Sequence, residues 1–179
     1  SEVVNLEIFG LDGITRLAVS PRGDKIALVV AEEPCTPLVV YLFRHAEKQI
    51  IKGEDNPELT DEGRERSEAL SEALKEINGA IYSSQYIRTR QTVAPLEKMW
   101  SVEARIVQAQ SPEEQINLLF ENHCGENVLI AGHSNTLPTL ISLLGISEEI
   151  TIDDDQYGDL FTVRWENGTP ELFIQQIGK

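Results

Sequence analysis

The pattern of apolar and polar positions divides the chain into two parts. The first part, residues 1–36, contains two apolar runs, 14–19 and 25–30, on either side of Ser-Pro-Arg-Gly-Asp. Proline, glycine and aspartate favour turns, so this pattern predicts an antiparallel β-hairpin. A single hairpin is marginally stable in water, and we expect residues 1–36 to be an extension packed on the rest of the chain. Two prolines in Glu-Glu-Pro-Cys-Thr-Pro mark the boundary with the second part, residues 37–179.

Apolar strands and amphipathic helices alternate over residues 37–179. The runs Leu-Val-Val-Tyr-Leu-Phe at 38–43 and Asn-Val-Leu-Ile-Ala-Gly at 127–132 are short and continuously apolar. Such runs are typical of strands that are buried on both faces of a parallel sheet. Segment 59–77 has apolar residues at helical spacing after Thr60, which can cap a helix. Further strands are expected at 80–84, 101–107, 159–165 and 171–177, and further helices at 87–100, 111–123 and 136–145.

The order of these elements predicts the fold class. Alternating strands and helices indicate an α/β protein, here a three-layer α/β/α sandwich with a mostly parallel central sheet. The last two strands alternate like an antiparallel end of that sheet. Pro95 predicts a bend or restart in the helix at 87–100, and Ser111 with Pro112 predicts a capped start of the following helix.

Charge narrows the classes of partner. The chain has 30 acidic and 15 basic residues among 179, a net charge of −15. A strongly acidic protein repels nucleic acid and anionic membranes, so an anionic substrate needs a local basic pocket. No apolar run approaches the roughly 20 residues of a membrane span. We expect a soluble protein without a signal peptide, either cytoplasmic or, if a leader has been removed, exported.

The chain contains only two cysteines, Cys35 and Cys124. Their number and separation do not indicate a disulfide framework or a zinc site. A single disulfide between them stays open at this stage. Asp153–Asp155 is a run of three acidic residues without the spacing of a calcium loop, and we expect it to be a solvated loop.

Histidine and arginine side chains follow the predicted strands at one edge of the sheet. The strand at 38–43 ends in Arg44 and His45, the strand at 80–84 is followed by Arg88, and the strand at 127–132 is followed by His133. In open α/β sheets, sites lie at the carboxyl ends of the strands. We therefore expect these four side chains to converge.

These residue types suit the handling of phosphate. A neutral imidazole can attack phosphorus and form a phosphohistidine, which splits one difficult step into two. Guanidinium groups bind phosphate oxygens in a bidentate manner and stay charged. The third histidine, His123, lies at a predicted helix end and is expected to cap that helix or lie on the surface.

The ordered motifs resemble those of the histidine phosphatase superfamily, the group that includes cofactor-dependent phosphoglycerate mutase. They are Arg-His-Ala-Glu-Lys at 44–48, Ser-Ser-Gln-Tyr-Ile-Arg-Thr-Arg-Gln-Thr at 83–92 and Gly-His-Ser-Asn-Thr at 132–136. The resemblance extends over about residues 38–177, and this part of the sequence is similar to short bacterial members of the superfamily. It implies a phosphoglycerate mutase-like fold, which the N-terminal β-hairpin extension predicted from the apolar pattern precedes.

The resemblance also implies roles for individual residues. His45 would be the phosphorylated nucleophile, Arg44 and Arg88 would bind the phosphoryl group, and His133 would stabilise its oxygens. Binding contributions are expected from Ser134, Asn135 and, at the rim, Lys48.

The proton donor of the family has no clear match in this sequence. Many family members have a carboxylate some two dozen residues after the equivalent of Arg88. Here that region offers Gln108 and Gln110, and the nearest acid is Glu113, followed by Glu114. Glu113 is the predicted general acid, and its absence from the site would suit good leaving groups such as phosphohistidine.

The predicted function is that of a metal-independent phosphatase without a cofactor, acting on a phosphorylated small molecule or a phosphoprotein. Only 44 residues separate Arg88 from His133, too few for the long insertion of the mutases, so a phosphatase is favoured over a mutase-type phosphotransferase. A non-catalytic phosphate-binding or interaction module is the third alternative. The sequence does not specify the oligomeric state.

Overall fold

The computed structural model describes residues 14–30 and 35–178. The chain divides into two compact units, Ser1–Cys35 and Thr36–Lys179. In the first unit, β1 (Ile14–Val19) pairs with β2 (Ile26–Val30) in the antiparallel hairpin that the sequence predicts. Its turn is closed by a hydrogen bond from the Gly23 amide to the Ser20 carbonyl, with Gly23 at a φ of +69°.

The second unit is built on a six-stranded sheet with strand order β5-β4-β6-β3-β7-β8. Four strands run parallel: β3 (Val39–Arg44), β4 (Gly79–Ser83), β5 (Arg105–Ile106) and β6 (Asn127–Gly132). The last two, β7 (Asp159–Glu166) and β8 (Thr169–Gln176), form an antiparallel edge. Asn167 and Gly168, both at positive φ, make the tight turn between them.

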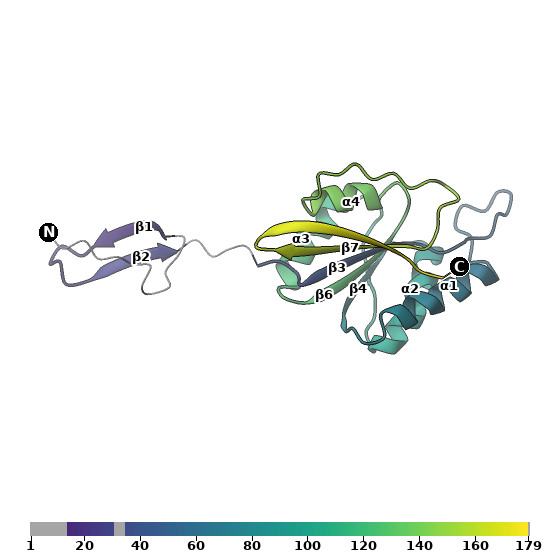
Figure 1. Cartoon of the computed structure of the whole chain (residues 1–179), viewed down its shortest axis with the longest axis horizontal. Coiled ribbons are helices and arrows are strands. Elements are labelled where there is room, and N and C mark those ends of the chain that lie inside the picture. The colour runs from purple at the N-terminus through teal and green to yellow at the C-terminus, as the bar shows by residue number, and fades with distance from the viewer. Residues whose placement is uncertain (1–13, 31–34, 179) are drawn as a thin grey trace. The chain divides into compact units, whose positions relative to one another are not determined.

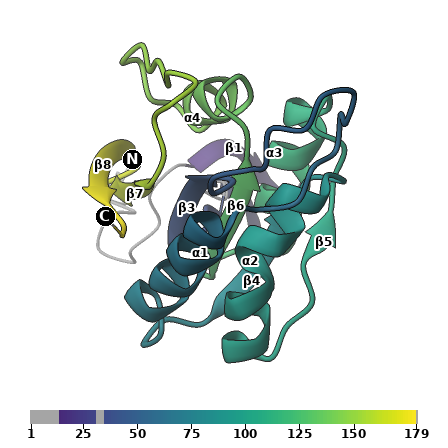
Figure 2. The ribbon, with the colours of Figure 1, turned by 90° about the vertical axis from the view of Figure 1, so that its right-hand side faces the viewer.

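Helices cover both faces of the sheet (Figure 1, Figure 2). On one face, α1 (Asp61–Ala73) and α2 (Ile87–Trp100) pack on strand residues such as Phe43 and Leu129. On the other, α3 (Pro112–Asn122) and α4 (Leu137–Leu143) pack on alternate strand residues such as Leu42 and Ile130. Because successive strand residues point to opposite faces, each strand contributes to two cores. The predicted three-layer α/β/α fold is confirmed.

The helix that contains Pro95, α2, is continuous, so of the predicted bend or restart the restart does not occur. A proline within a helix leaves the carbonyl four residues earlier without its amide partner. Here that carbonyl belongs to Gln91, and the Ser67 hydroxyl of α1 lies 3.1 Å from it and 2.7 Å from the Thr92 carbonyl. The neighbouring helix therefore supplies the hydrogen bond that Pro95 removes.

The strand predicted at 101–107 is reduced to two residues, β5. Ser101 ends α2 in a left-handed conformation with a φ of 56°, and the amides of Val102 and Ala104 bond to Glu97. These residues serve the helix terminus and are not available to the sheet. Ser111 occupies the N-cap position of α3 with Pro112 in the first turn, as the sequence predicts, although the Ser111 side chain makes no capping hydrogen bond. Thr60 does cap α1, through a 3.0 Å bond from the Gly63 amide to its hydroxyl.

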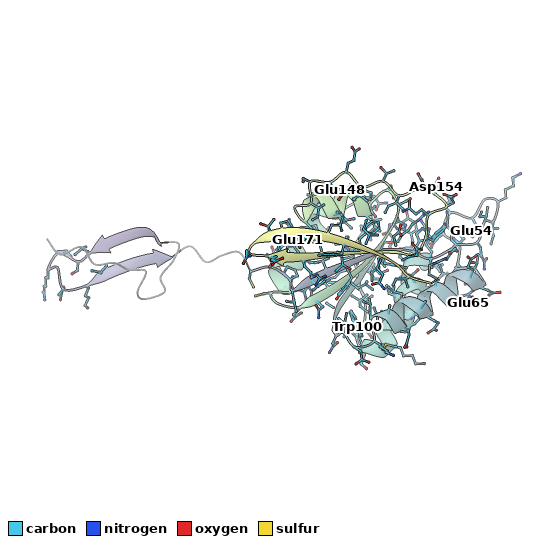
Figure 3. The ribbon with its side chains drawn as sticks, in the orientation of Figure 1. Glu54, Glu65, Trp100, Glu148, Asp154 and Glu171 are labelled. Atoms are coloured by element: carbon cyan, nitrogen blue, oxygen red, sulfur yellow. The ribbon has the colours of Figure 1, made fainter. Side chains whose placement is uncertain are left out.

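Acidic side chains are distributed over the outside of the second unit. Glu54, Glu65, Glu148, Asp154 and Glu171 are all exposed (Figure 3). No helix in the part of the chain that the structure describes is long and apolar enough to cross a membrane. Both Cys35 and Cys124 are disulfide-bonded, and the chain has no other cysteine.

Candidate active site

Three parallel strands bring the four predicted residues to one edge of the sheet. Arg44 at the end of β3 is paired in register with Gly132 at the end of β6. The His45 amide then bonds to the Gly132 carbonyl at 2.9 Å, which places His45 beside His133. The two imidazole centroids lie 5.3 Å apart with the rings inclined at 62°. Arg88 enters from the first turn of α2, which follows β4.

His45 is fixed in a buried position with one ring nitrogen committed. Its side chain is 3% exposed, and its Nδ1 lies 2.8 Å from the Ala46 carbonyl. A carbonyl only accepts, so Nδ1 carries the proton and Nε2 keeps a free lone pair. Burial lowers the pKa of His45 to about 3, and the charges of His133, Arg88 and Arg44 act in the same direction against the opposing hydrogen bond to Ala46. His45 is thus a neutral imidazole with its Nε2 available as a nucleophile.

The loop after His45 is held from two sides. The Ala46 amide donates to the Thr92 hydroxyl of α2 at 2.9 Å. Next to it, Glu47 accepts hydrogen bonds from the Arg66 guanidinium of α1, at 2.8 Å and 3.0 Å to Nε and at 2.6 Å to Nη2. Arg66 also donates to the Ile177 carbonyl at 2.7 Å. Glu47 therefore positions the loop that carries His45.

His133 is the second imidazole of the pocket and is also neutral. Its Nε2 lies 2.9 Å from the Ser84 hydroxyl, which lies 2.7 Å from the Thr89 hydroxyl. Burial is the largest cause that lowers the pKa of His133 to about 4, and the positive charges of Arg88, Arg44 and Lys48 lower it further. A neutral His133 can offer a hydrogen bond without requiring a proton from solvent.

Arg44 is held by backbone carbonyls of the loop that precedes β7. Its Nη1 donates to the carbonyls of Asp153 and Gln156, both at 2.7 Å, and its Nη2 donates to that of Asp154 at 2.9 Å. Its guanidinium carbon lies 4.2 Å from the Tyr157 ring centroid. As expected, the three aspartate side chains of this loop are exposed. Their main chain, however, has a part in fixing Arg44 that the sequence did not reveal.

Arg88 is anchored less fully. Its guanidinium carbon lies 4.3 Å from the Tyr86 ring centroid, and its Nη1 makes one long hydrogen bond, 3.5 Å, to the Asp55 carbonyl. Burial lowers its pKa from the usual value, although an arginine stays charged at any working pH.

Arg44 and Arg88 each have a buried Nε atom without a hydrogen-bond partner. Among the described residues, the buried side-chain nitrogen and oxygen atoms without a hydrogen-bond partner are Nε of Arg44 and Nε of Arg88. A buried N–H donor without an acceptor is costly, by about 1–3 kcal/mol, and more when it is charged. Both donors belong to residues that line one pocket, and an anion bound there would satisfy them.

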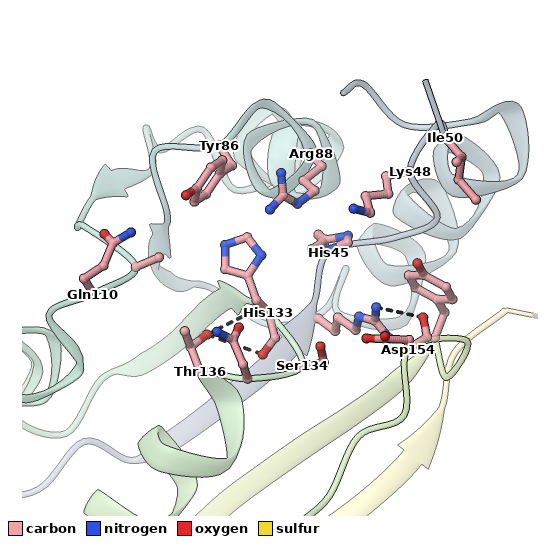
Figure 4. A pocket seen from close by; sticks show the side chains of 14 residues that line it. His45, Lys48, Ile50, Tyr86, Arg88, Gln110, His133, Ser134, Thr136 and Asp154 are labelled. Atoms are coloured by element: carbon pink, nitrogen blue, oxygen red, sulfur yellow. Dashed lines mark hydrogen bonds between the residues drawn. The ribbon is translucent and has the colours of Figure 1, made fainter. Parts of the chain in front are cut away.

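The pocket has a volume of about 610 Å³ (Figure 4). It contains all the predicted binding residues, including Lys48, Ser134 and Asn135. Sequence reasoning did not assign the remaining side chains to the pocket, because they come from loops whose course the strand pattern does not determine. These are Ile50, Tyr86, Ala109, Gln110, Thr136, Asp154 and Tyr157.

Glu113, the predicted general acid, is not brought to the pocket. It lies in the exposed first turn of α3, whose buried side is formed by Gln115, Ile116 and Leu119. The loop before α3 contributes Gln110 instead. Among the described residues that line the pocket, Asp154 is the one with a carboxylate.

His123 has the structural role that its place in the sequence predicts. It follows the last residue of α3, and its ring bridges the Tyr82 hydroxyl at 2.9 Å and the Glu126 carboxylate at 2.8 Å. It does not line the pocket. Within residues 14–30 and 35–178, no group of three or more histidine, cysteine, aspartate or glutamate side chains is arranged to hold a metal ion.

Comparisons with known proteins agree with this fold. Residues 40–111 match the family model of the histidine phosphatase superfamily (branch 1). No curated protein matches the sequence.

Solved structures with the same fold include phosphatases of that superfamily. The α-ribazole phosphatase from Shigella flexneri is similar with a TM-score of 0.63 at 16% identity, covering 77% of this chain and 96% of that chain. The protein histidine phosphatase SixA complexed with tungstate has a TM-score of 0.61 at 15% identity, with coverages of 77% and 96%. Phosphoserine phosphatase from Entamoeba histolytica, in complex with 3-phosphoglyceric acid, has a TM-score of 0.60 at 14% identity, with coverages of 79% and 97%. The predicted resemblance is therefore confirmed: residues 40–111 match the model of the histidine phosphatase superfamily, and the unit that contains them has a fold similar to those of these solved phosphatases.

Proposed function

We propose that the protein is a metal-independent phosphatase that hydrolyses phosphomonoesters or phosphohistidine through a phosphohistidine intermediate on His45. The observation that carries the proposal is the pair of buried, unpartnered Nε–H donors of Arg44 and Arg88 in one pocket with a neutral imidazole. Two guanidinium cations suit the equatorial oxygens of a phosphoryl group, and a free Nε2 suits in-line attack on phosphorus.

The reaction would proceed in two steps. Nε2 of His45 forms a bond to phosphorus while the bond from phosphorus to the leaving group breaks, and the leaving group departs with the bonding electron pair. Water then attacks the phosphohistidine, the P–N bond breaks, and inorganic phosphate and neutral His45 are released. Arg44, Arg88 and His133 stabilise the charge on the phosphoryl oxygens in both steps.

The proton donor limits the range of substrates. Glu113 does not line the pocket, and Asp154, which does, is exposed and meets Arg44 through its backbone carbonyl. The described part of the pocket therefore holds no buried carboxyl group that could protonate a leaving group. We therefore favour substrates with leaving groups that need little proton transfer, such as phosphohistidine or aryl phosphates. One structural relative is described as a protein histidine phosphatase, which is consistent with this preference.

Two alternatives remain distinct in their predictions. A mutase-type phosphotransferase needs a closed site that excludes water, whereas Ile50, Asn135 and Asp154, which line this pocket, are exposed. A non-catalytic phosphate-binding module would retain phosphate affinity without turnover.

Hydrolysis of 4-nitrophenyl phosphate between pH 4 and 8 in the presence of EDTA tests the proposal. We expect turnover that survives chelation and is lost in His45→Ala. Arg90→Ala is the matched control, because Arg90 is exposed and does not line the pocket. Unchanged turnover in His45→Ala would refute the assigned nucleophile, and phosphate binding without turnover in the wild-type protein would favour the binding module.

The disulfide bears on the cellular compartment. Disulfides persist mainly in oxidising compartments, and Cys35 and Cys124 are both disulfide-bonded. We propose that the protein works outside the reducing cytoplasm. Thiol alkylation of freshly lysed cells, followed by mass spectrometry, should leave both cysteines unmodified. Alkylation of both would place the working protein in a reducing compartment.

A further inference from the structure

A large apolar side chain stands exposed at the mouth of the pocket. Ile50 lines the pocket together with Lys48 and Arg88 (Figure 4). Its relative exposure is 98%, against 52% for the adjacent Ile51, which does not line the pocket. Exposed isoleucines are common singly, but this one belongs to the wall of a pocket that is otherwise dominated by cationic and polar groups.

The loop that carries Ile50 is well bonded on both sides of it. Lys48 forms a bridge with Leu59, and the Gln49 amide donates to the Glu58 carbonyl at 2.8 Å. On the other side, the Glu54 amide donates to the Ile51 carbonyl at 3.1 Å. The exposure of Ile50 is therefore not a consequence of an unsupported segment.

The same loop is attached to α2, which carries Arg88. The Ile87 amide donates to the Asn56 side chain at 2.9 Å, and the Leu59 amide donates to the Gln91 side chain at 2.8 Å. These bonds hold the loop against the turn of α2 that carries Arg88. Ile50 is thereby presented at a defined place in the wall of the pocket that would hold a phosphoryl group.

We propose that Ile50 is a specificity residue that contacts an apolar group of the substrate next to its phosphoryl group. The inference rests on the proposed function, since it places the phosphoryl group between Arg44 and Arg88. Partial burial of one isoleucine side chain by such a group favours binding by about five- to tenfold. The apolar group could belong to an amphipathic small molecule or to a side chain that flanks a phosphorylated residue in a protein.

Alkylphosphonates test this contact without any leaving group. Their dissociation constants are measured by calorimetry for methylphosphonate and n-hexylphosphonate, in the wild-type protein and in Ile50→Ser, Ile50→Leu and Ile51→Ser. We expect n-hexylphosphonate to bind the wild-type protein about five- to tenfold more tightly than methylphosphonate. Ile50→Ser should remove most of this preference and leave the affinity for methylphosphonate unchanged, whereas Ile50→Leu and Ile51→Ser should keep the preference.

Several results would overturn the proposal. They are the absence of a chain-length preference in the wild-type protein, an equal loss of preference in Ile51→Ser, or an equal loss of affinity for both phosphonates in Ile50→Ser. Failure of the premise that Arg44 and Arg88 bind phosphate gives a different result, because neither phosphonate would then bind. Failure of turnover alone is distinguished as well, because a binding module would bind both phosphonates and would not hydrolyse 4-nitrophenyl phosphate. Phosphohistidine peptides with leucine or serine next to the phosphorylated residue identify the carrier. Preference for the leucine peptide would indicate a protein substrate, and preference confined to alkylphosphonates would indicate a small molecule.

Discussion

Acidification should destabilise the second unit because His45 and His133 stay neutral in the folded protein at pH values where they are protonated in the unfolded chain. Their pKa values are lowered to about 3 and about 4, whereas an unfolded histidine has a pKa of about 6.5. The contribution of the two neutral histidines to the free energy of unfolding is fully present above pH 6.5. It is lost as the pH falls from 6.5 toward about 3 for His45 and about 4 for His133.

The size of the effect follows from these values. Between pH 7 and pH 4.5 each unfolded imidazole takes up a proton that its folded counterpart does not, which costs about 2–3 kcal/mol per histidine. Two such losses are a large fraction of the ~5–15 kcal/mol that stabilises a typical domain.

Urea unfolding at pH 7 and pH 4.5, in buffers free of phosphate, measures this loss. Both tryptophans of the chain, Trp100 and Trp165, lie in the second unit, so their fluorescence reports on the unit that carries the site. His45→Asn removes one titrating group. We expect the loss of stability on acidification to be smaller in this variant by about 2–3 kcal/mol. An equal loss in both proteins would refute the reasoning that burial keeps His45 neutral.

Three further changes test the supports of the site. Glu47→Gln should lower the free energy of unfolding by about 3 kcal/mol, since it removes the carboxylate that lies 2.6 Å from the buried Arg66 cation, whereas Glu62 lies 3.9 Å away; urea unfolding measures this. Gly158→Ala should destabilise by at least about 1 kcal/mol in the same assay, because Gly158 has a φ of +90° and an added Cβ would lie 2.5 Å from Nη1 of Arg66. Arg88→Ala should lower kcat/KM for 4-nitrophenyl phosphate about 100-fold, as charge-assisted hydrogen bonds are lost, whereas a loss below about threefold would argue against Arg88 as a phosphate ligand.

The sequence predicts the parallel part of the sheet and the convergence at its edge. Continuous apolar runs at β3 and β6 end in Arg44 and before His133, and parallel pairing places such ends side by side. These elements are predictable because burial on both faces leaves a strong signal in the sequence. The motif at Arg88 is predictable for the same reason, since it follows the buried strand β4.

The loops of the site are less predictable because long-range contacts determine them. Three backbone carbonyls of the loop before β7 accept hydrogen bonds from Arg44. Every residue type has a backbone carbonyl, so the sequence does not indicate which residues make these contacts. Tyr157 belongs to the same loop and also lines the pocket. Ile50 is an exposed apolar residue in a polar loop, and its place at the pocket depends on the hydrogen bonds that join this loop to α2.

Local chemistry explains the elements that were predicted incorrectly. Proline normally interrupts a helix, but the Ser67 hydroxyl from α1 compensates the carbonyl at Gln91. The distance between Arg88 and Glu113 in the sequence suits a general acid, but α3 places its first turn, which carries Glu113, in solvent.

The most direct test of the account is to identify the phosphorylated residue during turnover. The protein is mixed with 4-nitrophenyl phosphate, quenched rapidly in alkali and analysed by peptide mass spectrometry, with His45→Asn as the control. We predict an acid-labile, alkali-stable phosphate on His45 that decays in the absence of substrate and is missing in the variant. Turnover with the phosphate on another residue, or turnover in His45→Asn at the wild-type rate, would contradict the assignment of His45 as the nucleophile.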